Sequence, residues 1–190
     1  MSPRLGPRLP RAFYDRPTRA VARDLLGKIL VYEGPRGRRA ARIVEAEAYL
    51  GQRDPASHAY RGMTPRTVPM FGPAGFSYIY LSHGLYPCMN VVCEGPGVAA
   101  AVLLRGAEPL DGIADDPRRL AGPGLLCLAM GITTAQTSMD LVRSELTIRD
   151  APAVPARAVS RGPRIGLSPG ATFAELWRFW VTGSPGVSRR

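Results

Sequence analysis

The chain has 190 residues, of which 45% are hydrophobic, and it carries a formal net charge of +10 at pH 7. This length and composition favour one domain with a buried core. No apolar run is long enough to span a bilayer, and no apolar stretch follows the basic N-terminus, which argues against a membrane protein and against a signal peptide. We therefore expect a cytoplasmic protein, nucleoid-associated if the source is bacterial.

The positive charge is spread along the whole chain, and Lys28 is the only lysine among the 25 basic residues. A GC-rich genome explains the preference for arginine, but the spread suits a binding surface better than a basic tail. Polyanions are the expected partners, and a phosphate backbone is the commonest of them. A basic protein without such a partner is the alternative.

Cys88, Cys93 and Cys127 lack the regular spacing of a disulfide framework, which predicts reduced thiols packed in the core.

The first quarter of the chain predicts a tail, a helix and a hairpin. Residues 1–10 are rich in proline and arginine and are expected to be flexible, so a single domain would occupy residues 11–190. Asp15–Gly27 is typical of an amphipathic helix that ends at a glycine. Lys28–Glu33 and Arg39–Tyr49 predict two strands, joined by a hairpin with a basic tip.

The middle of the chain predicts a long loop and then more strands. Residues 50–75 have no periodicity, and a loop of that length in a compact domain is usually functional. Three further strands are predicted at Phe76–His83, Cys88–Cys93 and Val98–Glu108. With the two earlier strands they favour a mixed α+β fold, in which a mainly antiparallel sheet is flanked by helices.

The last part of the chain predicts helical structure followed by short segments. The elements expected there are a helical region over residues 110–142, a strand at Leu146–Ile148, a loop at 151–158, a short segment at Arg164–Leu167, a helix at Ala171–Trp177 and a final segment at Phe179–Thr182.

Polar and apolar residues alternate over residues 42–49, so a strand would present Glu45, Glu47 and Tyr49 on one face. Two carboxylates on one surface of a basic protein suggest chemistry on an anionic substrate. One possibility is a Mg²⁺-dependent nuclease that uses Glu45, Glu47 and Asp54, because hard cations prefer clustered oxygen ligands. Carboxylates two residues apart on a strand are, however, common by chance.

Other chemistries lack their motifs. A zinc-dependent base deaminase needs His-x-Glu and Pro-Cys-x-x-Cys. In this chain Cys88 is followed by Cys93 at the wrong spacing, and neither His58 nor His83 begins a His-x-Glu. No Walker A sequence is present. We therefore expect neither a zinc site nor a bound cofactor.

Aromatic side chains recur along the loop and the predicted strands, namely Tyr49, Tyr60, Phe71, Phe76, Tyr78, Tyr80 and Tyr86. Tyr78 and Tyr80 share one strand face. Aromatic residues interleaved with arginines such as Arg61, Arg66 and Arg105 are used for base stacking and phosphate contacts. A single tyrosine is more simply explained as part of a sheet core.

Longer motifs occur in a fixed order along the chain. They are RIVEAEAYLG (42–51), His58, TPR (64–66), MF (70–71), YIY (78–80), GLYPCMN (84–90), VLLRGAEPL (102–110), GP (122–123), RIG (164–166) and FWVTGSP (179–185). In order and content they resemble the alkyladenine (3-methyladenine, methylpurine) DNA glycosylases. The resemblance covers about residues 10–188, and the Glu-Ala-Tyr and Leu-Leu-Arg-Gly-Ala-Glu-Pro blocks are specific to that family.

This resemblance implies a monomeric DNA repair enzyme that acts on double-stranded DNA. Such an enzyme flips alkylated or deaminated purines (3-methyladenine, hypoxanthine, ethenoadenine) out of the duplex and hydrolyses the N-glycosidic bond with an activated water, leaving an abasic site. Flipping costs a few kcal/mol, least for a poorly paired base, so damage is partly selected before chemistry. The resemblance also implies a single domain built around a curved antiparallel sheet.

The resemblance further assigns catalytic roles. Glu47 matches the general base that activates the water, and a carboxylate there also stabilises the oxocarbenium character of the transition state. Arg105 and the backbone carbonyl of Ile165 match groups that hold the water. Glu45 is expected to be a strand neighbour or salt-bridge partner and not a catalyst.

The base pocket and the DNA contacts are assigned in the same way. Tyr49, His58 and Tyr80 match the pocket walls, whose rings suit positively charged alkylated purines. Asn90 and Leu103 match positions that exclude normal purines. The expected DNA-contacting residues are Thr64, Arg66, Met70, Leu85 and Tyr86.

His83 departs from the family pattern, which places a tyrosine at the tip of a hairpin that enters the minor groove. Imidazole is smaller but flat, so His83 is expected to be the intercalating wedge.

Lys28 lies outside every matched block, and a bifunctional glycosylase needs an amine to form a Schiff base, so a monofunctional enzyme is expected. Two alternatives stay open, a non-catalytic DNA-binding module of the same fold and the metal-dependent nuclease.

Overall fold

Strands form the framework of the molecule. The computed structural model describes residues 5–167 and 175–188. Within these residues one eight-stranded sheet is antiparallel at every pairing. Its strands are β1 (Ile29–Gly34), β2 (Gly37–Tyr49), β3 (Ser77–Ser82), β4 (Tyr86–Cys93), β5 (Ala100–Asp111), β6 (Leu146–Arg149), β7 (Val159–Gly162) and β8 (Arg178–Val181). The predicted α+β class with an antiparallel sheet is confirmed.

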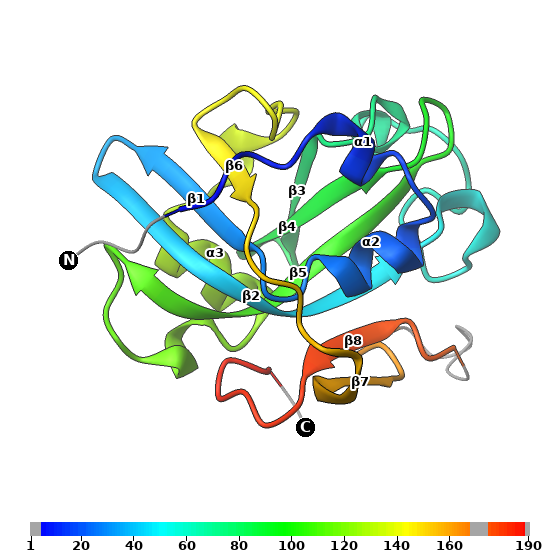
Figure 1. The fold of residues 1–190 in the computed structure, drawn as a ribbon. Helices are drawn as coiled ribbons and strands as arrows, with labels where there is room; N and C mark the ends of the chain where they lie inside the picture. The colour runs from blue at the N-terminus through cyan, green and yellow to red at the C-terminus, as the bar shows by residue number, and fades with distance from the viewer. Residues whose placement is uncertain (1–4, 168–174, 189–190) are drawn as a thin grey trace.

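The long strand β2 organises this sheet. The strand order is β3-β4-β5-β2-β1-β6, and β8 pairs with both β2 and β7. Figure 1 shows β7 and β8 beside β2, at the lower edge of the molecule. Register shifts next to Ala41 and Glu45 interrupt the pairing of β2 with β5. Bulges of this kind bend a strand and increase its twist, so the sheet curls around its core.

Three α-helices, α1 (Arg11–Tyr14), α2 (Thr18–Asp24) and α3 (Pro123–Met130), accompany the sheet in the described residues. Five 3₁₀ helices lie at Gly51–Arg53, Val68–Phe71, Pro117–Leu120, Thr134–Gln136 and Ala156–Ala158. No helix among the residues placed by the structure is both long and apolar enough to cross a bilayer.

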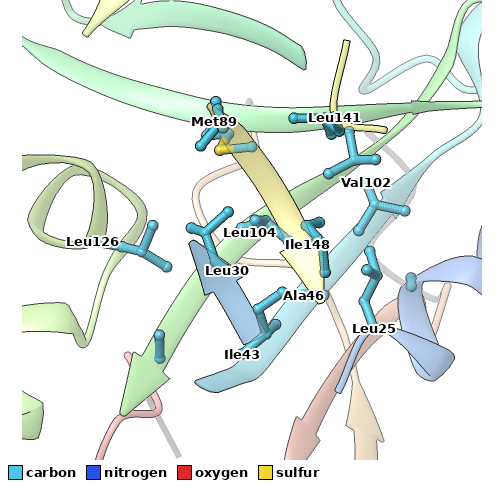
Figure 2. Packing of buried hydrophobic residues seen from close by; sticks show 14 of the residues in the cluster. Leu25, Leu30, Ile43, Ala46, Met89, Val102, Leu104, Leu126, Leu141 and Ile148 are labelled. Atoms are coloured by element: carbon cyan, nitrogen blue, oxygen red, sulfur yellow. The ribbon is translucent and has the colours of Figure 1, made fainter. Parts of the chain in front are cut away.

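The main core covers one face of the sheet. Figure 2 shows Leu30, Ile43 and Leu104 of the sheet between Leu25, which follows α2, and Leu126 of α3. Ala46 and Ala48 of β2 also belong to this core. Side chains alternate along a strand, so Glu47 and Tyr49 project from the opposite face. All three cysteines are buried free thiols, as predicted.

Several predicted boundaries were wrong. The helix expected over Asp15–Gly27 is the seven-residue α2, preceded by a separate turn of helix, α1. The region expected to be helical over 110–142 contains only α3 and two 3₁₀ helices, because Gly122–Pro123 and the left-handed Gly131 (φ 72°) limit α3 to eight residues.

The C-terminal prediction missed one strand. β7 begins at Val159 directly after the predicted loop, whereas Arg164–Leu167 is not a strand or a helix. Residues 171–174 of the helix predicted at Ala171–Trp177 lie outside the described residues, and 175–177 are not helical. Trp177 instead accepts a hydrogen bond from the backbone N–H of Ala48 at 2.9 Å.

Residues 5–10, the described part of the segment expected to be flexible, pack on β6. The backbone N–H of Leu9 donates to the carbonyl of Ile148 at 2.9 Å, and Leu9 is buried. Arg8 pairs with Arg149 and donates to the carbonyl of Val142 at 3.1 Å. The apolar side chain of Leu9 and the open edge of β6 thus account for the packing of these described residues, and the flexibility of residues 1–10 stays a prediction.

Candidate active site

A row of four side chains crosses the sheet on the face opposite the main core. Glu47 of β2 pairs with Leu103 of β5, Leu103 with Asn90 of β4, and Asn90 with Tyr78 of β3. Directly opposed residues on neighbouring strands project to the same face. The register of the sheet therefore places three sequence-predicted site residues, Glu47, Leu103 and Asn90, side by side.

Glu47 is completely buried, and three groups hold its carboxylate. The backbone N–H of Ile165 donates to Oε1 at 2.8 Å, and the Tyr49 hydroxyl donates to Oε2 at 2.9 Å. The Arg105 guanidinium lies 3.4 Å from Oε1 through Nε and 3.5 Å from Oε2 through Nη1. Ile165, which was predicted to act through its carbonyl, contacts Glu47 through its N–H.

The surroundings of Glu47 tune its basicity. Burial raises the pKa of the Glu47 carboxyl and Glu45 raises it further, whereas Arg105, the Ile165 N–H and Tyr49 act in the opposite direction. The pKa stays above the ordinary carboxyl value. A carboxylate with a raised pKa is a stronger base near neutral pH.

Arg105 connects two buried carboxylates. Its Nε lies 3.4 Å from an oxygen of Glu45 and 3.4 Å from an oxygen of Glu47, and has no hydrogen-bond partner among the described residues. Glu45 also accepts from Arg178 Nε at 2.6 Å and from the Ser188 N–H at 2.6 Å. Glu45 is thus a salt-bridge partner, as predicted, and the Arg105 Nε–H is a buried donor between two carboxylates.

A cavity of about 320 Å³ adjoins this row. Its lining includes the three predicted walls Tyr49, His58 and Tyr80, together with Asn90. Leu103 is buried between Glu47 and Asn90 in the sheet. The Asn90 amide nitrogen donates to the carbonyls of Tyr78 and Cys88 at 3.1 and 3.3 Å. These two bonds fix the orientation of the amide.

His58 and Tyr80 form an edge-to-face pair, with ring centres 4.4 Å apart and planes at 84°. His58 Nδ1 lies 3.3 Å from the Tyr78 hydroxyl, and Nε2 lies 3.4 Å from Arg66 Nη2. Partial burial and the Arg66 cation lower the pKa of His58 to about 4. The imidazole is therefore neutral at pH 7, and it presents an aromatic surface without a charge.

Comparison with known proteins agrees with this geometry. The sequence profile of the methylpurine-DNA glycosylase family matches residues 12–185. The chain belongs to the methylpurine-DNA glycosylase family. It is 50% identical over 182 residues to a putative 3-methyladenine DNA glycosylase of Myxococcus xanthus, covering 95% of this chain and 93% of the relative. A relative of the same name in Methanocella arvoryzae is 49% identical over 196 residues, 97% of each chain. The family predicted from the motifs is confirmed.

The residues that this family resemblance assigned to DNA contacts lie in two places. His83, Leu85 and Tyr86 are exposed at the β3–β4 hairpin, and Leu85 is 71% exposed. His83 (φ 50°) and Gly84 (φ 71°) occupy the two central positions of the turn closed by the Leu85 N–H and the Ser82 carbonyl. Positive φ at both positions is what a type I′ hairpin turn requires.

Thr64, Arg66 and Met70 come from the long loop. Thr64 and Arg66 are exposed, and the Arg66 guanidinium lies 5.3 Å from the centre of the Tyr80 ring. Met70 is only 3% exposed and lines the cavity. The structure thus places Met70 in the pocket wall, and its predicted contact with DNA stays a prediction.

Sequence reasoning missed Arg164 as a site residue. Its guanidinium makes a bidentate ion pair with Asp54 at 2.6 and 2.9 Å, and both side chains are completely buried. Asp54 is therefore unavailable to a metal, and no metal-binding group of three His, Cys, Asp or Glu occurs in the described part of the chain. The nuclease alternative has no site there.

Proposed function

We propose that this protein excises 3-methyladenine and related damaged purines, including hypoxanthine and ethenoadenine, from duplex DNA and leaves an abasic site. The observation that carries the proposal is Glu47, a buried carboxylate with a raised pKa beside a cavity with aromatic walls. Glycosidic cleavage needs a carboxylate next to a site that holds the leaving base. Membership of the methylpurine-DNA glycosylase family supports the same reaction.

In the proposed mechanism, Glu47 takes a proton from a water as the water oxygen bonds to C1′. The C1′–N9 bond breaks, and its electron pair leaves with the purine. The carboxylate also stabilises the positive charge that develops on the sugar. The Ile165 N–H and the Tyr49 hydroxyl fix the Glu47 oxygens, and the free Nε–H of Arg105 is placed to orient the water.

The pocket suits a flipped purine. Tyr49, His58 and Tyr80 offer aromatic surfaces around the cavity, and electron-rich rings attract a positively charged alkylated base. Because His58 is neutral at pH 7, it does not repel such a base. We assign Asn90 and Leu103, next to each other in the sheet, to the exclusion of normal purines.

The test is excision from duplex oligonucleotides that carry a single 3-methyladenine, hypoxanthine or ethenoadenine. We expect release of the free base and an alkali-labile abasic site, with no loss of activity in EDTA. Loss of activity in EDTA would support the metal-dependent nuclease. DNA binding without base release would support the non-catalytic module. Gel filtration of the complex tests the proposed action as a monomer.

We expect the His83→Ala variant to bind lesion-containing duplex about tenfold more weakly, because a side chain that fills the gap in the stack compensates part of the unstacking cost. Fluorescence anisotropy with lesion-containing and undamaged duplexes measures this. Because the positive φ of His83 (50°) strains alanine, His83→Gly is the control variant that removes the side chain without straining the turn. If His83→Ala behaves as wild type and Leu85→Ala does not, the wedge is Leu85.

We expect no covalent adduct with DNA on borohydride treatment, apart from adducts at the N-terminal amine. Lys28, the only lysine, is 8% exposed, and its Nζ donates to Asp150 and to the Ala151 carbonyl, both at 2.6 Å. A buried ammonium that is held in this way cannot attack C1′ as a free amine. A borohydride-stable adduct that disappears in Lys28→Arg would contradict the monofunctional mechanism.

A further inference from the structure

A buried cation lies behind the pocket wall. The Arg164 guanidinium carbon is 4.5 Å from the centre of the Tyr49 ring and 5.0 Å from that of Trp177. The Arg164 side chain is completely buried and does not line the cavity, whereas Tyr49 does. The Tyr49 ring therefore separates the guanidinium from the space in which a flipped base would stack.

The charge of this cation is matched by Asp54. Besides the two bonds to Asp54, Arg164 Nη1 donates to the Ala48 carbonyl at 3.0 Å. Asp54 in turn accepts from the backbone N–H groups of Leu50 and Ala56 at 3.2 and 3.0 Å. Each partner thus has supports of its own, which hold it in place when the other is neutral.

The distance from the Arg164 guanidinium to a base stacked on Tyr49 is short enough for an unmatched charge on Arg164 to affect that base. A base stacked at about 3.5 Å on the open face of Tyr49 would lie about 8 Å from the guanidinium, given the 4.5 Å on the other side. At an effective dielectric constant of about 20, two unit charges about 8 Å apart change an equilibrium by up to about 30-fold. A neutral base would not feel this effect.

We infer that the Asp54–Arg164 ion pair sets the preference of the pocket between positively charged and neutral damaged purines, with Asp54 masking the Arg164 charge so that a cationic purine can stack on Tyr49. Neither residue touches the base, so both act as positioning residues through Tyr49. This inference rests on the proposed glycosylase function and deepens it.

Other charged groups surround the pocket. Glu47 and Arg105 lie next to the wall residue Tyr49, whose hydroxyl donates to Glu47, and Arg66 lies beside His58 and Tyr80. They stay the same in all the variants below. Arg164 also interacts electrostatically with Glu47, so the double variant is needed to separate the effect of the pair on the bound base from an effect on Glu47.

The experiment measures single-turnover excision at pH 8 with enzyme in excess of DNA but below saturation, so that the rate constant includes binding of the base. The duplexes have one sequence and carry 3-methyladenine (cationic) or hypoxanthine (neutral). For Asp54→Asn we expect the ratio of the two rate constants, cationic over neutral, to fall about five- to tenfold. For Arg164→Gln we expect it to rise, because the Asp54 carboxylate loses its cationic partner while the backbone N–H groups of Leu50 and Ala56 still donate to it. The double variant, with neither charge, should return the ratio to within about twofold of wild type.

Asp150→Asn is the matched control, because it removes a carboxylate from the Lys28 ion pair, away from the cavity, and should leave the ratio unchanged. The two single variants predict opposite signs, so either suffices if the other does not fold. If every folded variant excises both lesions more slowly by the same factor, the Asp54–Arg164 pair has a purely structural role and the inference is overturned. If wild type releases neither base, the proposed function itself fails, and the inference with it.

Discussion

Glu47→Gln is expected to lower single-turnover excision of hypoxanthine by about 10³-fold or more, within the range attributed to general base catalysis. The amide oxygen of the introduced glutamine would still accept the Ile165 N–H, so the pocket should keep its shape. Hypoxanthine is the best lesion for this test because it is neutral in DNA and leaves as an anion unless it gains a proton, so its release depends strongly on the activated water. 3-Methyladenine is cationic and therefore a better leaving group, so Glu47→Gln should lower its rate of excision less.

Stability separates this loss of chemistry from loss of folding. The pKa of Glu47 is raised in the folded protein, mainly by burial. A carboxyl with a raised folded-state pKa contributes stability below its unfolded pKa and loses that contribution as the pH rises through the folded pKa. At pH 7 the ionised Glu47 therefore costs stability, and we expect Glu47→Gln to have a Tm equal to or above that of wild type.

Lesion binding by Glu47→Gln should be close to wild type, as measured by anisotropy. Base release that persists at the wild-type rate in a folded variant would remove Glu47 from the mechanism. A variant with a lower Tm and weaker lesion binding would instead point to a structural role for this carboxylate.

The strand that carries Glu47 could be predicted because alternation is a local property. Polar and apolar residues alternate strictly from Glu45 to Tyr49, and the structure places Glu47 and Tyr49 on the face opposite Ala46 and Ala48. The family motifs assigned Asn90 and Leu103 to the base pocket, but the strand register that brings them next to Glu47 is contained in no pattern within a single strand. The bulge beside Glu45 is not visible in that pattern either.

Arg164 could not be recognised as part of the site from sequence. Its partner Asp54 is 110 residues away, and each residue alone looks like an ordinary charged loop residue. Burial of both depends on two irregular loops meeting behind Tyr49, which is a tertiary property. The burial of Met70, which was predicted to contact DNA, could not be anticipated for the same reason, because the loop that carries it folds inward against Tyr78. The prediction of a long helical region over residues 110–142 was wrong because glycine and proline end a helix even where the apolar content favours it.

Arg105→Gln is expected to lower excision about 100-fold at pH 7 and to move the acid limb of the pH–rate profile to higher pH. Arg105 is the cation that lowers the pKa of Glu47, against burial and against Glu45, so its loss raises that pKa further. The general base must be ionised to work, so the rate at pH 7 falls more than the rate at pH 9.

Arg105→Lys is the matched variant, because it keeps the charge between Glu45 and Glu47 but loses the planar group that reaches both. Its acid limb should stay near that of wild type while its maximal rate falls. In Arg105→Gln the two carboxyl groups lose their shared cation, so the folded state should be destabilised more at pH 8 than at pH 5, as thermal unfolding at the two values would report. An unchanged acid limb in Arg105→Gln would mean that Arg105 orients the water without tuning the base, and that the Ile165 N–H and the Tyr49 hydroxyl suffice to keep Glu47 ionised.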